Sequence, residues 1–125
     1  MVGEDVSLYD QVGGELVVTD VVARFYERVI SDDLLSHWFK WSKPVELQRH
    51  LRTYLAVALD GPEHYTGRSM RKVHGGMRIT NEAFDTMIAR LLESLAESGV
   101  KSSVLTKVDA RLGKLRAVVV DPLRA

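Results

Sequence analysis

The sequence predicts an all-α protein, and three observations lead to that prediction. Apolar residues recur at intervals of three and four positions over four long segments, which is the spacing of one face of an α-helix. No segment alternates apolar and polar residues over the length of a β-strand. Glycine and proline fall between the periodic segments, at Gly13-Gly14, Gly61-Pro62, Gly75-Gly76 and Gly99, where they end helices and open turns.

The helix boundaries follow from capping residues. Ser7 is a suitable N-cap for a very short first helix that ends at Gly13. Pro44 fits the first turn of a helix because its missing N–H group would be unpaired there in any case. Thr80 caps a later long helix, which Gly99 closes. The expected helices cover, in order, residues 7–13, 15–31, 33–38, 42–59, 69–74, 80–98 and 102–119.

The apolar stripes indicate which side of each helix is buried. The stripe is strongest in residues 15–31, where it comprises Val18, Val21, Val22, Phe25, Tyr26, Val29 and Ile30. Similar stripes follow the segments 42–59, 80–98 and 102–119. Four substantial helices with short extra turns are compatible with either a helical bundle or a globin-like packing, and periodicity alone leaves that topology open.

Length, charge and cysteine content exclude several classes of protein. The 125 residues fit a single domain, 1–125, whose residues 1–6 we expect to form an N-terminal tail. The 17 basic residues balance the 17 acidic ones, which argues against a nucleic-acid partner. The chain has no cysteine, so disulfides and thiolate metal sites are excluded. No apolar run is long enough to span a bilayer and no signal-peptide layout is present, so we expect a cytoplasmic protein without a membrane partner.

The histidines are the main candidates for chemistry. His37 and His64 lie among polar or loop positions and are most simply surface residues. His74 ends a short helix and precedes two glycines. It could stabilise the helix C-terminus as a cation, or bind the iron of a haem as a neutral imidazole. His50 falls about 40° outside the apolar arc of its helix, so it could reach over a pocket rim or lie in solvent.

Tyr26 lies in the middle of the most apolar helix. A buried tyrosine needs a hydrogen-bond partner for its hydroxyl group. That partner could be the backbone, or the hydroxyl could donate to a bound ligand. The sequence contains no phosphate-binding glycine loop, no HExxH motif and no nucleophile elbow.

Three blocks of sequence carry a family resemblance. Residues 7–14 read SLYDQVGG, residues 24–33 read RFYERVISDD and residues 65–74 read YTGRSMRKVH. Their order and spacing resemble group I of the truncated haemoglobin family, over roughly residues 7–119. The resemblance implies a globin-like two-over-two helical sandwich around one haem b per chain, with His74 as the proximal iron ligand.

The resemblance also implies the residues of the haem pocket. Apolar side chains would cover the haem faces, and Arg71, with Arg68, would lie near the propionates. Phe39 matches the family's haem-packing phenylalanine, and Phe84 matches the start of the next family helix. The expected haem-pocket residues are Phe39, Leu47, Leu51, Met70, Arg71, Val73, Ile79, Phe84 and Met87.

Departures from the family pattern concern the side of the haem where gas binds. Leu47 and Leu51 stand where glutamines are frequent, so Tyr26 is the one family hydrogen-bond donor that remains on that side. At the position of His50, some family members have a histidine or lysine that binds the iron as a sixth ligand. No histidine follows His74, so a covalent haem link through a C-terminal histidine cannot form.

The leading functional prediction is reversible binding of oxygen, nitric oxide or carbon monoxide at haem iron, for transport or scavenging. An enzymatic alternative is a nitric oxide dioxygenase, which would need a cellular reductase as a partner. Another alternative is a redox or sensing protein with His74 and His50 both on the iron. A haem-free helical interaction module is the remaining alternative.

Overall fold

The computed structural model describes residues 6–60 and 78–120, and within these ranges all regular secondary structure is helical. Residues 1–5 of the expected tail and the expected short helix at 69–74 lie outside the described ranges. The helices are α1 (Leu8–Val12), α2 (Gly14–Ile30), α3 (Ser36–Phe39), α4 (Pro44–Ala58), α6 (Asn81–Glu97), α7 (Ser102–Gly113) and α8 (Arg116–Val119).

Two helix starts follow the capping residues that the sequence indicates. The Ser7 hydroxyl accepts the backbone N–H of Asp10 at 3.1 Å at the start of α1. The Thr80 hydroxyl accepts the backbone N–H of Ala83 at 3.0 Å at the start of α6. Gly13 separates α1 from α2 with a φ of +124°, and a Cβ atom there would lie 2.3 Å from a Val17 methyl group. This turn therefore requires glycine.

Three boundaries differ by two residues or more from the sequence-based expectation. The short helix expected at 33–38 is α3 (Ser36–Phe39), because residues 33–35 form a turn after α2. Helix α4 begins at Pro44 with Lys43 as its N-cap, so Ser42 lies outside the helix. The expected last helix is divided into α7 and α8 after Gly113. Glycine is a poor helix former, and the N–H of Leu115 bonds to the carbonyl of Leu112, three residues back, at 2.9 Å. This tighter turn interrupts the α-helical ladder.

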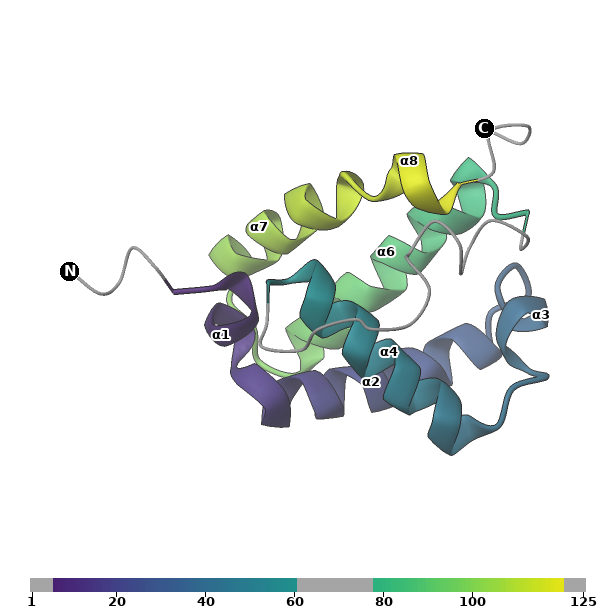
Figure 1. The fold of residues 1–125 in the computed structure, drawn as a ribbon, viewed down its shortest axis with the longest axis horizontal. Helices are drawn as coiled ribbons and strands as arrows, with labels where there is room; N and C mark the ends of the chain where they lie inside the picture. Colours follow the sequence, from purple (N-terminus) through teal and green to yellow (C-terminus); the bar gives the residue numbers. More distant parts are fainter. Residues whose placement is uncertain (1–5, 61–77, 121–125) are drawn as a thin grey trace.

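The helices form a two-over-two sandwich, which confirms the predicted fold class. Helix α2 packs against both α4 and α6, and α6 packs against α7. Figure 1 shows α2 and α4 crossing on one side, with α6 and α7 on the other. The short α1 contacts both α2 and α7, which closes one end of the sandwich.

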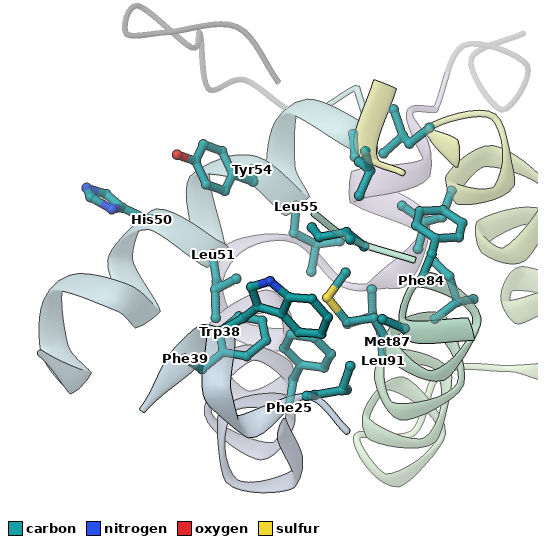
Figure 2. A pocket seen from close by; sticks show the side chains of 18 of the residues that line it. Phe25, Trp38, Phe39, His50, Leu51, Tyr54, Leu55, Phe84, Met87 and Leu91 are labelled. Atoms are coloured by element: carbon teal, nitrogen blue, oxygen red, sulfur yellow. The ribbon is translucent and has the colours of Figure 1, made fainter. Parts of the chain in front are cut away.

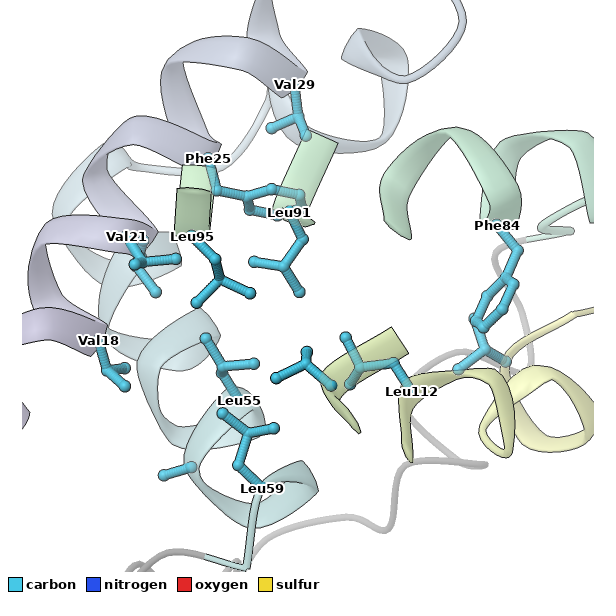
Figure 3. Packing of buried hydrophobic residues seen from close by; sticks show 14 of the residues in the cluster. Val18, Val21, Phe25, Val29, Leu55, Leu59, Phe84, Leu91, Leu95 and Leu112 are labelled. Carbon is cyan, nitrogen blue, oxygen red and sulfur yellow. The ribbon is translucent and has the colours of Figure 1, made fainter. Parts of the chain in front are cut away.

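The hydrophobic core lies where the four long helices meet (Figure 3). Val21 of α2, Leu59 at the end of α4, Leu95 of α6 and Val108 of α7 have no exposed surface. Burial of such side chains from several helices at one point is the main source of stability for a helical domain. This packing fixes the positions of the helix segments that surround the cavity described below.

Ion pairs join α2 to α6 on the surface of the sandwich. Arg24 contacts Asp20 at 2.9 Å and Glu97 at 3.0 Å, and Arg28 contacts Glu97 at 2.5 Å. The Ser98 hydroxyl and the Arg24 guanidinium hold the pKa of Asp20 below its ordinary value. Arg28 and Arg24 likewise lower the pKa of Glu97. These groups favour the ionised carboxylates in the folded chain.

Asp32 is a further carboxylate in contact with α6. Its carboxylate contacts Arg90 at 3.2 Å and accepts the backbone N–H of Leu34 at 2.9 Å. Burial acts to raise the pKa of Asp32, but the hydrogen bonds from Arg90 and from the backbone of Leu34 and Leu35 outweigh it and lower the pKa. The turn after α2 is thereby held against α6.

We expect these ion pairs to make the protein sensitive to acid. Because the three carboxyl pKa values are lower in the folded chain, the unfolded chain binds protons first as the pH falls. The stabilisation is complete above the ordinary carboxyl values of 3.8 and 4.5, and is lost as the pH falls through the lower folded values. The melting temperature, measured by circular dichroism from neutral pH to about pH 3, should fall steeply at the acid end.

The variant Glu97→Gln should show a lower melting temperature at neutral pH and a shallower fall in acid. Glu15→Gln is the matched control, because Glu15 is exposed on α2 and has no ion pair within the described residues. Identical acid profiles for Glu97→Gln and the parent protein would contradict the assignment.

Candidate functional site

A cavity of about 370 Å³ opens between α3, α4 and the first half of α6 (Figure 2). Its volume lies in the range of small-molecule and cofactor sites. Helix α2 and the ends of α7 and α8 complete the walls. The described residues that line it are Val22, Phe25, Leu35, Trp38, Phe39, Ser42, Leu47, His50, Leu51, Tyr54, Leu55, Ala58, Ile79, Ala83, Phe84, Met87, Ile88, Leu91, Leu112, Leu115 and Val119.

The lining is strongly apolar. Among the described lining residues, polar groups come only from Ser42, His50, Tyr54 and the indole N–H of Trp38, and no carboxylate contributes. An apolar lining with few polar groups favours a largely apolar ligand, because a charged ligand would lose its hydration without gaining partners.

Phe84 forms one wall of the cavity, and its ring is held from behind. The guanidinium of Arg116 lies 4.7 Å from the centre of the Phe84 ring, within cation–π range. Arg116 is itself fixed by hydrogen bonds to Asn81 at 2.7 Å and Asp85 at 2.5 Å. The start of α6 and the short α8 therefore position this aromatic ring together.

Helix α4 supplies the opposite wall. Leu47 and Leu51 are four residues apart, share one face of the helix, and line the cavity in a partly buried position. His50 lies at the edge of the cavity and is exposed. Figure 2 shows its imidazole ring on the outer side of α4, beside Tyr54, with the ring centres 6.2 Å apart.

Tyr26 and its neighbour Phe25 have different surroundings. Phe25 lines the cavity, whereas Tyr26 is buried, with 8% of its surface exposed, and is not among the lining residues. Within residues 6–60 and 78–120 the Tyr26 hydroxyl makes no hydrogen bond. The backbone partner considered from the sequence is therefore not present in this part of the structure.

The structure brings together six of the residues expected in the pocket: Phe39, Leu47, Leu51, Ile79, Phe84 and Met87. His50 joins them at the edge. Met70, Arg71, Val73 and His74, with Arg68 and His64, lie outside the described residues.

Several lining residues were absent from the set expected in the pocket. Trp38 and Ser42 lie within three residues of Phe39, and this closeness in sequence to an expected pocket residue could have indicated that they line the cavity. Phe25 and Leu91 lie on apolar stripes that the sequence does show, but a stripe does not distinguish a cavity wall from a packed core. The centres of the Trp38 and His37 rings lie 3.9 Å apart, and His37 is exposed.

A family model, a relative of known sequence and solved structures all match this chain, and all of them are globins. A family model described as "Bacterial-like globin" matches residues 7–120. A group 1 truncated hemoglobin of Mycolicibacterium paratuberculosis is 35% identical over 105 residues, covering 84% of this chain and 77% of that protein. The Fe(III) form of the truncated hemoglobin from Tetrahymena pyriformis superposes with a TM-score of 0.86 at 29% identity, covering 93% of this chain and 99% of that one.

A second solved structure is similar at lower identity. The 2/2 hemoglobin of a Synechococcus species, in the cyanomet state with covalently attached heme, has a TM-score of 0.79 and is 26% identical, over 90% of this chain and 95% of that one. Within the described residues, no helix is long and apolar enough to cross a bilayer.

Proposed function

We propose that this chain, which belongs to the truncated haemoglobins within the bacterial-like globin family, reversibly binds O2, NO and CO on a single b-type haem. Haem-based binding of diatomic gases follows from the family itself. The observation that carries the finer proposal is the apolar cavity between α4 and α6, which Trp38 and Phe39 of α3 also line.

The described cavity residues suit a haem. Haem is a flat plate with apolar faces, and the cavity offers Leu47 and Leu51 on one wall and Phe84 and Met87 on another. Contact with both faces would remove apolar surface from water, which is the main favourable term in binding such a group. The absence of carboxylates from the described lining avoids repulsion of the two propionates.

Bound haem would supply an iron centre with an open position for a diatomic gas. His74 would hold the iron through one imidazole nitrogen, while its other nitrogen donates to a backbone carbonyl or to water and so fixes the tautomer. Arg71 would pair with a propionate. Leu47 and Leu51 would keep water away from the gas-binding side, because their side chains offer no hydrogen bond.

The absorption spectrum of the purified protein tests this proposal. We expect a Soret band and one haem per chain in the ferric form, and a shifted band when carbon monoxide is added to the ferrous form. Purified protein that stays colourless after titration with haem would contradict the proposal and favour a haem-free interaction module.

We expect the variant Tyr26→Phe to release oxygen several-fold faster than the parent protein. The Tyr26 hydroxyl has no hydrogen bond within the described residues, and Leu47 and Leu51 cannot donate one. A single hydrogen bond contributes about 0.5–1.5 kcal/mol, and the loss of that free energy corresponds to a several-fold faster release of oxygen. Stopped-flow displacement of oxygen by carbon monoxide measures the rate, and an unchanged rate would remove Tyr26 from the gas site.

A second candidate function is suggested by His50 at the edge of the cavity. If its side chain turned inward, His50 could bind the iron opposite His74 and suit the protein to electron transfer or to nitric oxide dioxygenation with a reductase. The exposed position of His50 leaves its ring free to turn. The competing ligand would lower the apparent affinity for oxygen, because oxygen could bind only to the fraction of molecules in which His50 is not on the iron.

The ferric spin state distinguishes this second function from the first. With His50 on the iron, the ferric protein should be low-spin at neutral pH, and His50→Ala should make it largely high-spin with water bound. A parent protein that is already high-spin would leave His50 as a residue of the cavity edge.

A further inference from the structure

Arg116, the first residue of α8, lies against the start of α6. Phe84 and Asp85 follow Asn81 by three and four residues, so the three side chains share one face of α6. The Arg116 guanidinium donates to the Asn81 side-chain oxygen at 2.7 Å and to the Asp85 carboxylate at 2.5 Å. Its central carbon lies 4.7 Å from the centre of the Phe84 ring. One side chain of α8 therefore contacts three side chains on this face of α6.

These contacts use the shape of an arginine side chain. A guanidinium is flat and carries donors along its edge, so it can bond to two acceptors while its face covers an aromatic ring. A lysine ammonium is a compact charge that can lie over a ring but lacks this flat array of donors. The bonds to Asn81 and Asp85 therefore fix the guanidinium over the Phe84 ring, within cation–π range.

Phe84 connects Arg116 to the cavity. The Phe84 ring is buried and lines the cavity on the side of α6 (Figure 2). Leu115 and Val119, on either side of Arg116 in the sequence, also line the cavity, whereas Arg116 is not among the lining residues. Any action of Arg116 on a bound ligand therefore passes through the position of its neighbours, and above all through the aromatic ring that it covers.

The charge of Arg116 is a weaker route to the ligand than its position. The Asp85 carboxylate neutralises the guanidinium, and 43% of the Arg116 side chain is exposed to water. A paired and partly hydrated charge has little effect at a distance. The contact instead fixes the ring of Phe84, which is 2% exposed and cannot turn without displacing its neighbours.

The shape of this wall matters for an asymmetric ligand such as haem b. A haem that is turned over presents methyl groups where vinyl groups stood, so it can enter the cavity in two orientations whose ratio depends on the walls. We propose that Arg116 is a positioning residue, which holds the Phe84 ring so that one haem orientation is favoured and haem loss is slowed. This inference rests on the proposed function.

The variant Arg116→Met tests the proposal, because methionine keeps most of the aliphatic stem and removes the cation and the donors. Transfer of haem to apomyoglobin should be about threefold faster or more, the size expected when a cation–π contact is lost. The ¹H NMR spectrum of the ferric cyanide form should show a larger fraction of the minor haem orientation at equilibrium. Arg116→Lys, which keeps a cation near the ring, should restore part of both properties.

Two further variants separate a positioning role from a general loss of stability. Arg28 of α2 pairs with Glu97 of α6 at 2.5 Å and does not line the cavity. Arg28→Met should therefore lower the melting temperature but leave the rate of haem loss and the haem orientation unchanged. Phe84→Leu removes the ring on which Arg116 acts, so Arg116→Met added to it should have no further effect on either haem measurement.

Each possible failure has a distinct meaning. A parent protein without a Soret band would contradict the proposed function, and this inference with it. A normal Soret band, with haem loss and haem orientation that Arg116→Met leaves unchanged, would overturn the positioning role alone. Equal effects of Arg116→Met with and without the Phe84 ring would show that Arg116 acts by another route, and would also overturn the proposal.

Discussion

Replacement of His74 by alanine is expected to abolish stable haem binding. His74 ends the segment that resembles the family's proximal sequence, and a neutral imidazole is the usual protein ligand of a globin haem. Without it, only apolar contacts and the propionate pairs would hold the haem. The variant should lose haem to a scavenger such as apomyoglobin far faster than the parent protein, and added imidazole should restore a parent-like spectrum.

His37→Ala is the matched control for this experiment. His37 is exposed and is not among the residues that line the cavity, so its removal should leave the Soret band and the rate of haem loss unchanged. A His74→Ala protein with the parent's spectrum and haem affinity would show that another residue binds the iron.

The second large effect is expected from Leu95→Ala in the core. Leu95 has no exposed surface, and Figure 3 shows it among side chains of α2 and α4. Truncation of a fully buried leucine to alanine costs about 2–5 kcal/mol, because apolar contacts are lost and a cavity remains. The total stability of a domain is only about 5–15 kcal/mol, so the variant should lose a large fraction of its free energy of unfolding.

Urea denaturation of the haem-free protein measures this loss, since bound haem would add its own stabilisation to the folded state. Leu16→Ala removes the same atoms from a side chain that is 85% exposed, and should change the stability by less than about 0.5 kcal/mol. Equal effects of the two substitutions would contradict the described packing of α2, α4 and α6.

The positions of the long helices and two of the N-caps could be predicted from the sequence. The apolar spacing predicts α2, α4 and α6 to within about two residues, and Ser7 and Thr80 act as the N-caps that their positions indicate. These features are local, because a cap or a periodic stripe depends only on residues within a few positions of one another. The family, and with it the two-over-two fold and haem-based gas binding, was also accessible from the order of the sequence blocks.

Which side chains reach the cavity depends on how the helices pack in three dimensions. Phe25 and Tyr26 are adjacent on one stripe, yet only Phe25 lines the cavity. Neighbouring residues on a helix point about 100° apart, so a small rotation of α2 against α4 and α6 exchanges their surroundings. Periodicity does not fix the rotation of α2. That rotation is fixed by the side chains that pack between the helices.

The same reason applies to His50, Trp41 and the last helix. The position of His50 outside the apolar arc left both the cavity edge and solvent open, and the packing of α4 places it at the edge with its ring exposed. Trp41 belongs to no periodic segment, so only the course of the turn between α3 and α4 shows that it is exposed. The division of α7 from α8 after Gly113 brings Leu115 and Val119 to the cavity, and that arrangement depends on contacts with α6 that are distant in sequence.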